Sequence, residues 1–363
     1  MAIAILGAGI FAREAHLPAL QKLAGIVPDL KAVYSHSEGS ATKLATLATT
    51  TLGLSSAPSV YHDFDASANL DALLARDDIT SVIVILPILV QPSVILKALA
   101  AGKHVLSEKP VAKDVKSGLE LIAEYEAKYK SKGLVWRVAE NFEAEPGFIR
   151  VADAIKKGRI GRVQQFHARV VNFVDAESKW YNTAWRNVPE YQGGFILDGG
   201  VHTTAALRTI LPSPGMTHLS AFASLNKRML APQDTVHAIV KVGDQAHGIV
   251  DMTWGHPVQA RPNSDGFLFT GEKGWISVNQ ITDSATNAPI LRIKISTHEG
   301  DETIDEPSKG VEAELASFFA KVKGEETLDI GHPLEALKDV TFVQAALSSS
   351  GALVDLGALV ASG

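Results

Sequence analysis

Three groups of residues in this chain have types and spacings that suit chemistry on a bound small molecule. The first is the pattern Gly7-x-Gly9-x-x-Ala12, which directly follows an apolar run and opens an amphipathic segment. Glycines at these positions allow a tight turn and a close approach of backbone amides to a pyrophosphate. We therefore predict a dinucleotide site rather than an ordinary strand-to-helix turn. Its expected contacts are Gly7, Gly9, Ile10, Phe11, Ala12 and Arg13.

The second group is Lys109 in the run Ser107-Glu108-Lys109-Pro110, which ends an apolar segment. A lysine before a proline is usually a surface cation in a turn. If the apolar segment is a parallel strand, however, its carboxyl end lies where open sheets bind ligands. There a lysine can hydrogen-bond a hydroxyl group and stabilise developing negative charge.

The third group is the glycine-rich segment 193–202, which contains Asp198 and His202. These residues are four apart, so on a helix they share one face and can converge on one ligand. An imidazole titrates near pH 6.5, which suits transfer of a hydroxyl proton. The plainer interpretation is a helix start with an N-terminal aspartate and an ordinary histidine. Because no other cluster with metal-ligand spacing is visible, we predict no metal site.

The end of the second apolar run bears on the choice of cofactor. Sites for NAD commonly place a carboxylate there, about 20 residues past the glycines, to bind the ribose hydroxyls. This chain has Ser35-His36-Ser37, with Glu38 just beyond and Lys43 further on. These hydroxyl, imidazole and ammonium groups can donate to a 2′-phosphate, unless they are merely solvated loop residues. The sequence therefore favours NADP(H) over NAD(H).

The secondary-structure elements that must position these groups show two different hydrophobic patterns along the chain. Up to about residue 140, apolar runs alternate with amphipathic segments, which indicates βαβ units and a parallel sheet. The predicted strands are 2–6, 30–35, 59–63, 81–86, 103–107 and 134–139, and the predicted helices 11–24, 69–76, 92–101 and 115–130. We therefore expect an α/β protein whose N-terminal part is a doubly wound Rossmann sheet.

Beyond a predicted helix at 148–157, long segments alternate apolar and polar residues. This alternation is typical of a mainly antiparallel open sheet with one face available to solvent or a partner. The segments are 163–174, 218–225, 235–242, 247–254, 267–278 and 291–296, with helices expected at 195–210, 311–322 and 333–350. We predict an NAD(P)-binding domain at 1–145 and a substrate-binding and oligomerisation domain at 146–363.

The composition excludes several function classes. The chain has 363 residues, 46% of them hydrophobic, which suits about two globular domains. Without cysteine it has no disulfide, thiolate metal site or cysteine nucleophile. Its 34 basic residues are outnumbered by 40 acidic ones and form no basic run, so a nucleic-acid partner is not supported. We see no targeting segment and no apolar run near the ~20 residues that span a bilayer, and we expect a cytoplasmic protein.

In their order and spacing these motifs resemble the glucose-fructose oxidoreductase / inositol dehydrogenase / MocA (Gfo/Idh/MocA) family, and most closely a fungal NADP(H)-dependent oxidoreductase branch. The resemblance covers essentially the whole chain, including a late glycine turn at 271–275 and the segment 333–336. It implies a Rossmann domain followed by an α/β domain with a large open sheet. The face of that sheet commonly forms the subunit interface in the family, so a homodimer, or a tetramer, is expected.

The resemblance also implies roles for particular residues. It places Lys109 beside the nicotinamide, often before a cis proline, and matches the catalytic aspartate and histidine to Asp198 and His202. Many relatives read Thr-Pro-Asn-x-x-His where this chain reads Leu-Pro-Ile-Leu-Val-Gln at 86–91, so contacts there would be largely main-chain. The further residues expected at the cofactor or substrate are Leu86, Pro87, Gln91, Glu108, Pro110, Asn141, Trp185 and Arg186.

Two functions remain open from the sequence. The first is an NADP(H)-dependent oxidoreductase that transfers hydride between nicotinamide C4 and a secondary alcohol or carbonyl of a sugar, polyol or related small molecule. In it, His202 takes the hydroxyl proton, Lys109 orients the oxygen, and Asp198 holds Lys109 or the substrate. The alternative is a non-catalytic, dinucleotide-sensing regulatory protein of the same fold. The complete catalytic set favours the enzyme, while the sequence does not identify the substrate.

Overall fold

The computed structural model describes residues 2–362, and contacts divide the chain into two compact units. The first comprises Met1–Ala112, Ser117–Asn141 and Val311–Ala336. The second comprises Lys113–Lys116, Phe142–Gly310 and Leu337–Gly363. The predicted single boundary near residue 145 therefore differs from this division, because a late segment returns to the first unit. Within the described chain, no helix combines the length and apolar character needed to cross a membrane.

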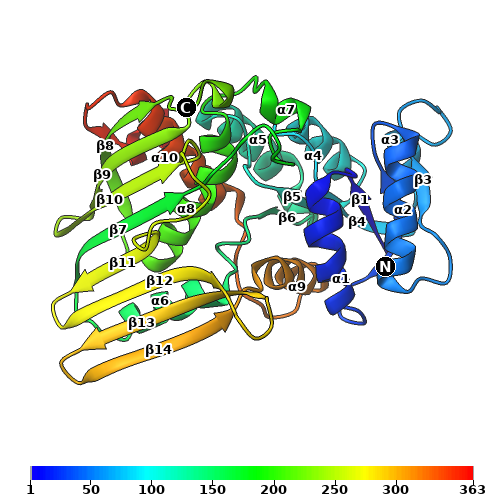
Figure 1. The fold of residues 1–363 in the computed structure, drawn as a ribbon. Coiled ribbons are helices and arrows are strands. Elements are labelled where there is room, and N and C mark those ends of the chain that lie inside the picture. The colour runs from blue at the N-terminus through cyan, green and yellow to red at the C-terminus, as the bar shows by residue number, and fades with distance from the viewer. Residues whose placement is uncertain (1, 363) are drawn as a thin grey trace. The chain divides into compact units, whose positions relative to one another are not determined.

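The first unit is built on a six-stranded sheet in which every neighbouring pair is parallel (Figure 1). The strand order is β3-β2-β1-β4-β5-β6. The doubly wound sheet predicted from the apolar runs is confirmed. The strands are β1 (Ala2–Leu6), β2 (Asp29–Tyr34), β3 (Ser59–Tyr61), β4 (Ile79–Val84), β5 (His104–Glu108) and β6 (Trp136–Ala139).

Helices connect the strands of this sheet. They are α1 (Leu17–Lys22), α2 (Glu38–Leu52), α3 (Leu70–Leu74), α4 (Gln91–Ala100) and α5 (Val115–Lys128), with a 3₁₀ turn at Lys130–Lys132. The helix predicted at 11–24 begins as a π-helical turn, Ala12–His16, before it continues as α1.

A late helix, α9 (Gly310–Lys323), completes the core of the first unit. Its buried side chains Leu315, Phe318 and Phe319 belong to the same hydrophobic cluster as Ile3 and Ile5 of β1. Burial of this apolar surface explains why the segment after residue 310 returns to the first unit.

The second unit contains a nine-stranded sheet with the order β14-β13-β12-β11-β7-β10-β9-β8-β15. Only β7 and β10 run parallel; the other neighbouring pairs are antiparallel, as the alternating segments predicted. The strands are β7 (Val163–Val171), β8 (Met216–Ser224), β9 (Thr235–Val242), β10 (Ala246–Thr253), β11 (Gly266–Gly271), β12 (Gly274–Thr282), β13 (Pro289–Thr297), β14 (Gly300–Pro307) and β15 (Val354–Asp355).

One predicted strand was wrong. The segment 267–278 is a hairpin of β11 and β12 rather than a single strand. Gly271 and Gly274 flank the turn, and a Cβ on either would lie 2.2 Å or less from a backbone carbonyl oxygen, of Ile160 and Ser296 respectively. Only glycine allows this close approach of neighbouring backbones, so the glycines mark the turn.

Helices cover one face of the nine-stranded sheet. The α6 helix (Pro146–Lys156) packs on β12–β14, and α8 (Phe195–Ile210) packs on β7 and β10 (Figure 1). From Val236 to Val242, alternation in β9 buries one side of the strand and exposes the other, as its sequence predicted, while Thr235 is buried as well. The unit is completed by α7 (Ala184–Asn187), a 3₁₀ turn at Arg228–Leu230, α10 (Pro333–Ser348) and α11 (Leu356–Ser362).

The C-terminal end of α8 is held by a buried ion-pair network around Arg208. Its guanidinium donates from Nε and Nη2 to the two carboxylate oxygens of Asp339, at 3.1 and 2.9 Å, and from Nη1 to Glu143 Oε1 at 3.2 Å. Burial works to lower the pKa of Arg208, but the two carboxylates outweigh it and raise that pKa. The network therefore ties α8 to α10 and to the segment that precedes α6.

Replacing Arg208 with methionine should destabilise the protein by about 3–5 kcal/mol, because two buried carboxylates lose their cation. Denaturant unfolding measures this change. The control is Arg292→Met, which removes an arginine from the exposed pair with Asp305 and should leave the unfolding midpoint nearly unchanged. A loss below about 1 kcal/mol for Arg208→Met would show that the network does not stabilise the fold.

Candidate functional site: a dinucleotide turn and an Asp-x-x-x-His helix

The turn after β1 has the shape that a dinucleotide needs. Gly7 has φ +121°, and a Cβ there would lie 2.0 Å from the carbonyl oxygen of Ile85. Gly7 also donates its backbone N–H to Tyr34 O at 2.8 Å. At Gly9, by contrast, a Cβ would meet no heavy atom within 4 Å, so the backbone there is open to an approaching phosphate. The residues present therefore fit a bound pyrophosphate.

The helix that follows this turn is joined to the end of β5 by a buried hydrogen bond. His16 Nε2 lies 2.7 Å from Glu108 Oε1, and the two side chains are 0% and 8% exposed. Glu108 directly precedes Lys109, whose peptide bond to Pro110 is cis. The segment that carries Lys109 is thus fixed to the helix that begins at the dinucleotide turn.

Glu314 of α9 lies beside this pair. The ligand-type atoms of His16, Glu108 and Glu314 all lie within 4.8 Å of one another, and the three side chains are buried. The sequence predicted no metal site because these residues are far apart along the chain. The spatial cluster could not be seen from their spacing.

The end of β2 brings together residues that the sequence did not connect. His36 Nδ1 lies 2.8 Å from Asp63 Oδ2, and the Tyr34 hydroxyl donates to Asp63 Oδ1 at 2.6 Å. Partial burial works to raise the pKa of Asp63, but hydrogen bonds from Tyr34 and His36 outweigh it and hold that pKa below its ordinary value. The reasoning from a missing carboxylate was incomplete, because Asp63 supplies one from the loop after β3.

Other residues predicted to contact the cofactor also lie at the carboxyl ends of the strands of this sheet. Ser37 caps α2 by accepting a hydrogen bond from Ser40 N at 3.4 Å. Leu86 and Pro87 follow β4, and Gln91 opens α4. The Gln91 side chain is buried, and within residues 2–362 neither of its amide atoms has a hydrogen-bond partner. Such a buried amide needs a polar partner, which a bound cofactor can supply.

In the second unit, the start of α8 positions Asp198. Gly193 and Gly194 have φ of +71° and +50° and lead into the helix. Asp198 Oδ2 accepts a hydrogen bond from Arg186 Nε at 2.7 Å, and both side chains are largely buried. The Arg186 guanidinium also stacks on Trp185, 3.9 Å from the ring centroid. The structure therefore brings the adjacent predicted site residues Trp185 and Arg186 together with Asp198, twelve residues after Arg186.

His202 lies one helical turn beyond Asp198 and stacks on Phe142, with 4.7 Å between ring centroids. Lys109 and Asn141 belong to the first unit, whereas Asp198 and His202 belong to the second.

Sequence reasoning missed Tyr191, which lies near Asp198. Its ring is 6.1 Å from that of Trp185, and its hydroxyl is buried without a hydrogen-bond partner in the described chain. Burial first, and then the charge of Asp198, raises the pKa of Tyr191. In the sequence, Tyr191 stands out only as an aromatic residue just before the glycine-rich segment. A single aromatic residue is too common a feature to predict a site.

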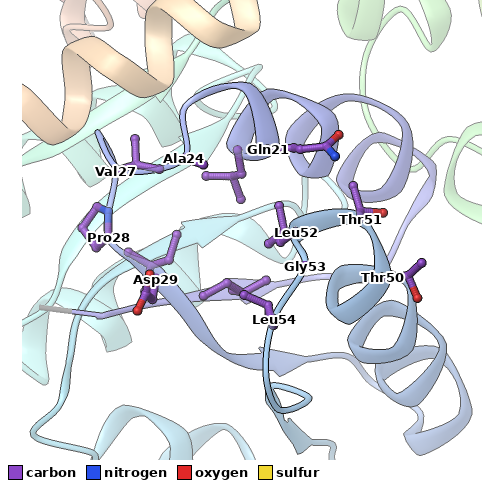
Figure 2. A pocket seen from close by; sticks show the side chains of 14 residues that line it. Gln21, Ala24, Val27, Pro28, Asp29, Thr50, Thr51, Leu52, Gly53 and Leu54 are labelled. Carbon is purple, nitrogen blue, oxygen red and sulfur yellow. The ribbon is translucent and has the colours of Figure 1, made fainter.

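A cavity of about 320 Å³ in the first unit lies away from these residues (Figure 2). Its lining comes from the end of α1, the start of β2 at Asp29 and the end of α2 at Leu52. This is the amino end of the parallel strands, whereas open sheets bind dinucleotides at the carboxyl end. None of the predicted site residues lines this cavity.

Comparison with known proteins decides the family. The model for the oxidoreductase family with an NAD-binding Rossmann fold matches residues 1–134, and the GFO/IDH/MocA C-terminal domain model matches residues 148–277. Dehydrogenase FPY6 of Fusarium mangiferae is 37% identical over 354 residues, which cover 96% of each chain. The chain belongs to the Gfo/Idh/MocA family. It is an NAD(P)-dependent dehydrogenase or reductase.

A further relative and two proteins of the same fold differ in what they act on and bind. A dTDP-3,4-didehydro-2,6-dideoxy-alpha-D-glucose 3-reductase from Actinomadura kijaniata is 28% identical over 62% of this chain and 64% of its own length. KijD10, a 3-ketoreductase from the same organism solved with NADP and TDP-benzene, has a TM-score of 0.73 at 23% identity and covers 95% of this chain and 96% of its own. An Agrobacterium radiobacter oxidoreductase solved with NAD+, L-tartaric acid and magnesium has a TM-score of 0.77 at 19% identity and 99% coverage of both chains.

Gly9→Ala should weaken dinucleotide binding at least about tenfold while leaving thermal stability unchanged, because its methyl group enters open space that the phosphate must approach. Gly7→Ala should instead lower the unfolding temperature, since its methyl group meets the Ile85 carbonyl. Fluorescence titration with NADPH and thermal unfolding measure the two effects. Wild-type NADPH affinity in Gly9→Ala would show that the turn does not bind the cofactor.

Proposed function

We propose that this protein is an NADP(H)-dependent oxidoreductase acting on a secondary alcohol, or the corresponding carbonyl, of a sugar, polyol or related small molecule. The observation that carries the proposal is the completeness of the residue set that the family motifs match. Lys109 precedes a cis proline, and Asp198 is bound by Arg186 one helical turn before His202. A regulatory protein that only senses a dinucleotide would not need these three groups.

The proposed roles follow from the chemistry of each side chain. When bound, the nicotinamide supplies or accepts the hydride. In oxidation His202 takes the substrate's hydroxyl proton, while Lys109 hydrogen-bonds the same oxygen and stabilises its developing charge. Asp198 offsets the positive charge of the donors around it and orients them. Arg186 holds Asp198 in place through their 2.7 Å hydrogen bond.

The groups at the end of β2 support NADP(H) as the cofactor. His36 is exposed, and its bond to Asp63 uses Nδ1, so that Nε2 can donate to a 2′-phosphate when the imidazole is protonated. The Tyr34 hydroxyl and His36 each bind one oxygen of the Asp63 carboxylate, so that both oxygens are already hydrogen-bonded within the protein. Ser35, Ser37 and Lys43 add further donors at the same edge. Among proteins of this fold, KijD10 binds NADP and the Agrobacterium protein NAD+.

A sugar-like substrate is supported by the relative that reduces a 3-keto dideoxy sugar nucleotide. By its name, that relative acts as a 3-reductase on a dTDP-linked didehydro sugar. We propose that this chain likewise acts on a sugar carbon that carries a hydroxyl or a carbonyl group.

We also propose that the protein assembles as a homodimer, or a tetramer, through the uncovered face of its nine-stranded sheet. Ile239, Ile249, His167 and Leu268 form a row of directly paired residues across β9, β10, β7 and β11. The three apolar members are 64%, 46% and 41% exposed. Exposed apolar side chains that gather in one row of an open sheet, here with one histidine among them, are typical of a surface that a partner covers.

Ile239→Lys should shift the protein toward a monomer, since burying a lysine in this interface costs more than the contact contributes. Light scattering after size exclusion measures the mass. The control is Leu328→Lys, which places the same charge at an exposed apolar residue of the first unit and should leave the mass unchanged. An Ile239→Lys protein of wild-type mass would contradict this interface.

Lys109→Ala should lower turnover at least about 100-fold, the scale of one acid–base or electrostatic contribution. NADPH affinity should stay nearly the same, because the turn at Gly7–Gly9 is untouched. Steady-state NADPH oxidation and NADPH titration measure the two quantities, with Lys113→Ala as a control. Turnover near that of the wild type would remove Lys109 from the mechanism.

A further inference from the structure

The loops that follow β2 and β3 are joined into one edge of the parallel sheet. Ser35 donates its backbone N–H to Tyr61 O at 3.1 Å, and Asp63 donates its own to His36 O at 3.3 Å. These bonds continue the pairing of β2 with β3 beyond the carboxyl ends of both strands. In Rossmann sheets the adenosine ribose of a dinucleotide is bound just after the second strand. His36 therefore stands where that ribose is expected.

The imidazole of His36 is oriented by contacts with two residues of the second loop. Its Nδ1 lies 2.8 Å from Asp63 Oδ2, and its ring centroid lies 5.2 Å from that of Phe64. The Tyr34 hydroxyl donates to the other carboxylate oxygen, Asp63 Oδ1, at 2.6 Å, so the carboxylate is itself held in place. The His36 side chain is nevertheless 79% exposed, so a ligand can reach it.

The Asp63 carboxylate decides which ring nitrogen carries a hydrogen. Partial burial works to raise the pKa of Asp63, but the hydrogen bonds from Tyr34 and His36 outweigh it, so this carboxyl is ionised at neutral pH. An ionised carboxylate only accepts hydrogen bonds, so Nδ1 of His36 must carry a hydrogen. In a neutral imidazole that is the one ring hydrogen, and Nε2 is then an acceptor that cannot bind a phosphate dianion. The imidazolium has a hydrogen on each nitrogen and can bind both groups.

The other charged or titratable groups at this edge lie in the second loop and on α2. In the loop, His62 accepts a hydrogen bond at Nδ1 from Phe64 N at 3.2 Å, and the Asp65 carboxylate is bound by donors of its own loop. The α2 helix begins with Glu38 and carries Lys43 in its second turn. Aspartate, glutamate and lysine side chains ordinarily keep their charge between pH 6.5 and 9, whereas imidazoles lose theirs there. Among these groups, a change of charge in that range is therefore expected of the histidines.

We propose that His36 makes the preference for NADP(H) over NAD(H) depend on pH, because only its imidazolium can bridge the Asp63 carboxylate and the 2′-phosphate. Binding of the phosphate favours the protonated ring, so the preference is strong at lower pH and falls as the pH rises and the ring loses its proton. Ser35, Ser37 and Lys43 retain a smaller preference at high pH. This inference rests on the proposed function and adds a regulation of its cofactor site.

Fluorescence titration of the full-length protein with NADPH and with NADH, at several values between pH 6.5 and 9, tests the proposal. NADH is the reference because it lacks only the 2′-phosphate. The ratio of the NADH dissociation constant to the NADPH dissociation constant should fall at least about tenfold from pH 6.5 to pH 9. The phosphate contributes little to this change, since its second pKa lies near 6.

Four variants separate the imidazole from its surroundings. His36→Arg should keep the preference at pH 9, because a guanidinium stays charged there, and His36→Gln should show a weak preference at every pH. Asp63→Asn keeps an acceptor for Nδ1 but removes the charge that favours the imidazolium, so the fall should move to lower pH. The matched control His62→Gln removes the neighbouring imidazole and should keep the wild-type dependence on pH.

A ratio that stays the same in the wild type between pH 6.5 and pH 9 would overturn the proposal, and so would a fall that persists in His36→Gln. The comparison of the two cofactors on the wild type decides the question even if a variant folds poorly. Hydride transfer is measured separately. A protein that reduces a carbonyl with NADPH but shows a preference independent of pH therefore loses this inference while keeping the proposed function.

Discussion

The buried hydrogen bond between His16 and Glu108 is the interaction on which the candidate site of the first unit depends. It joins the π-helical turn after the dinucleotide motif to the residue that precedes Lys109. Both side chains are almost completely removed from water, so breaking the bond would leave two polar groups without compensation. The position of the lysine is thereby linked to the turn whose open backbone at Gly9 receives the phosphates.

In the second unit, the helix α8 holds the candidate site residues in place, and buried ion pairs fix this helix. Arg186 binds Asp198 near the start of the helix, and Arg208 binds Asp339 and Glu143 near its end. A helix that is fixed at both ends by charged hydrogen bonds holds His202 at a defined place between them, against Phe142. The close contact between Gly199 and Trp254 then sets how near the sheet lies to this face of the helix.

The sequence predicted the parallel sheet well because buried strands are continuous apolar runs; β1 and α8 match their predicted bounds. It failed where the pattern depends on distant parts of the chain. The polar strand β14 has no apolar alternation and forms by pairing with β13 at the sheet edge. The return of α9 to the first core depends on Phe318 and Phe319 packing with β1, which no local pattern reveals.

The local motifs of the candidate site could be predicted from the sequence, whereas the contacts between distant residues could not. Each motif carries its own local signal, so the glycine turn, Lys109 and the Asp-x-x-x-His helix were found. The bond between His36 and Asp63 joins the loops that follow β2 and β3, and Tyr191 lies near Asp198 of α8. Such contacts follow only from the fold.

The central claim is that this protein transfers hydride to a carbonyl carbon rather than only sensing a dinucleotide. The most direct test incubates the protein with NADPH deuterated at C4, on either face, and a panel of keto sugars and oxidised polyols. Mass spectrometry then measures the deuterium content of the products. The account predicts an alcohol that carries one deuterium on the former carbonyl carbon, from one face of the cofactor only. Tight NADPH binding with no deuterated alcohol from any member of the panel would contradict it and would favour a regulatory role.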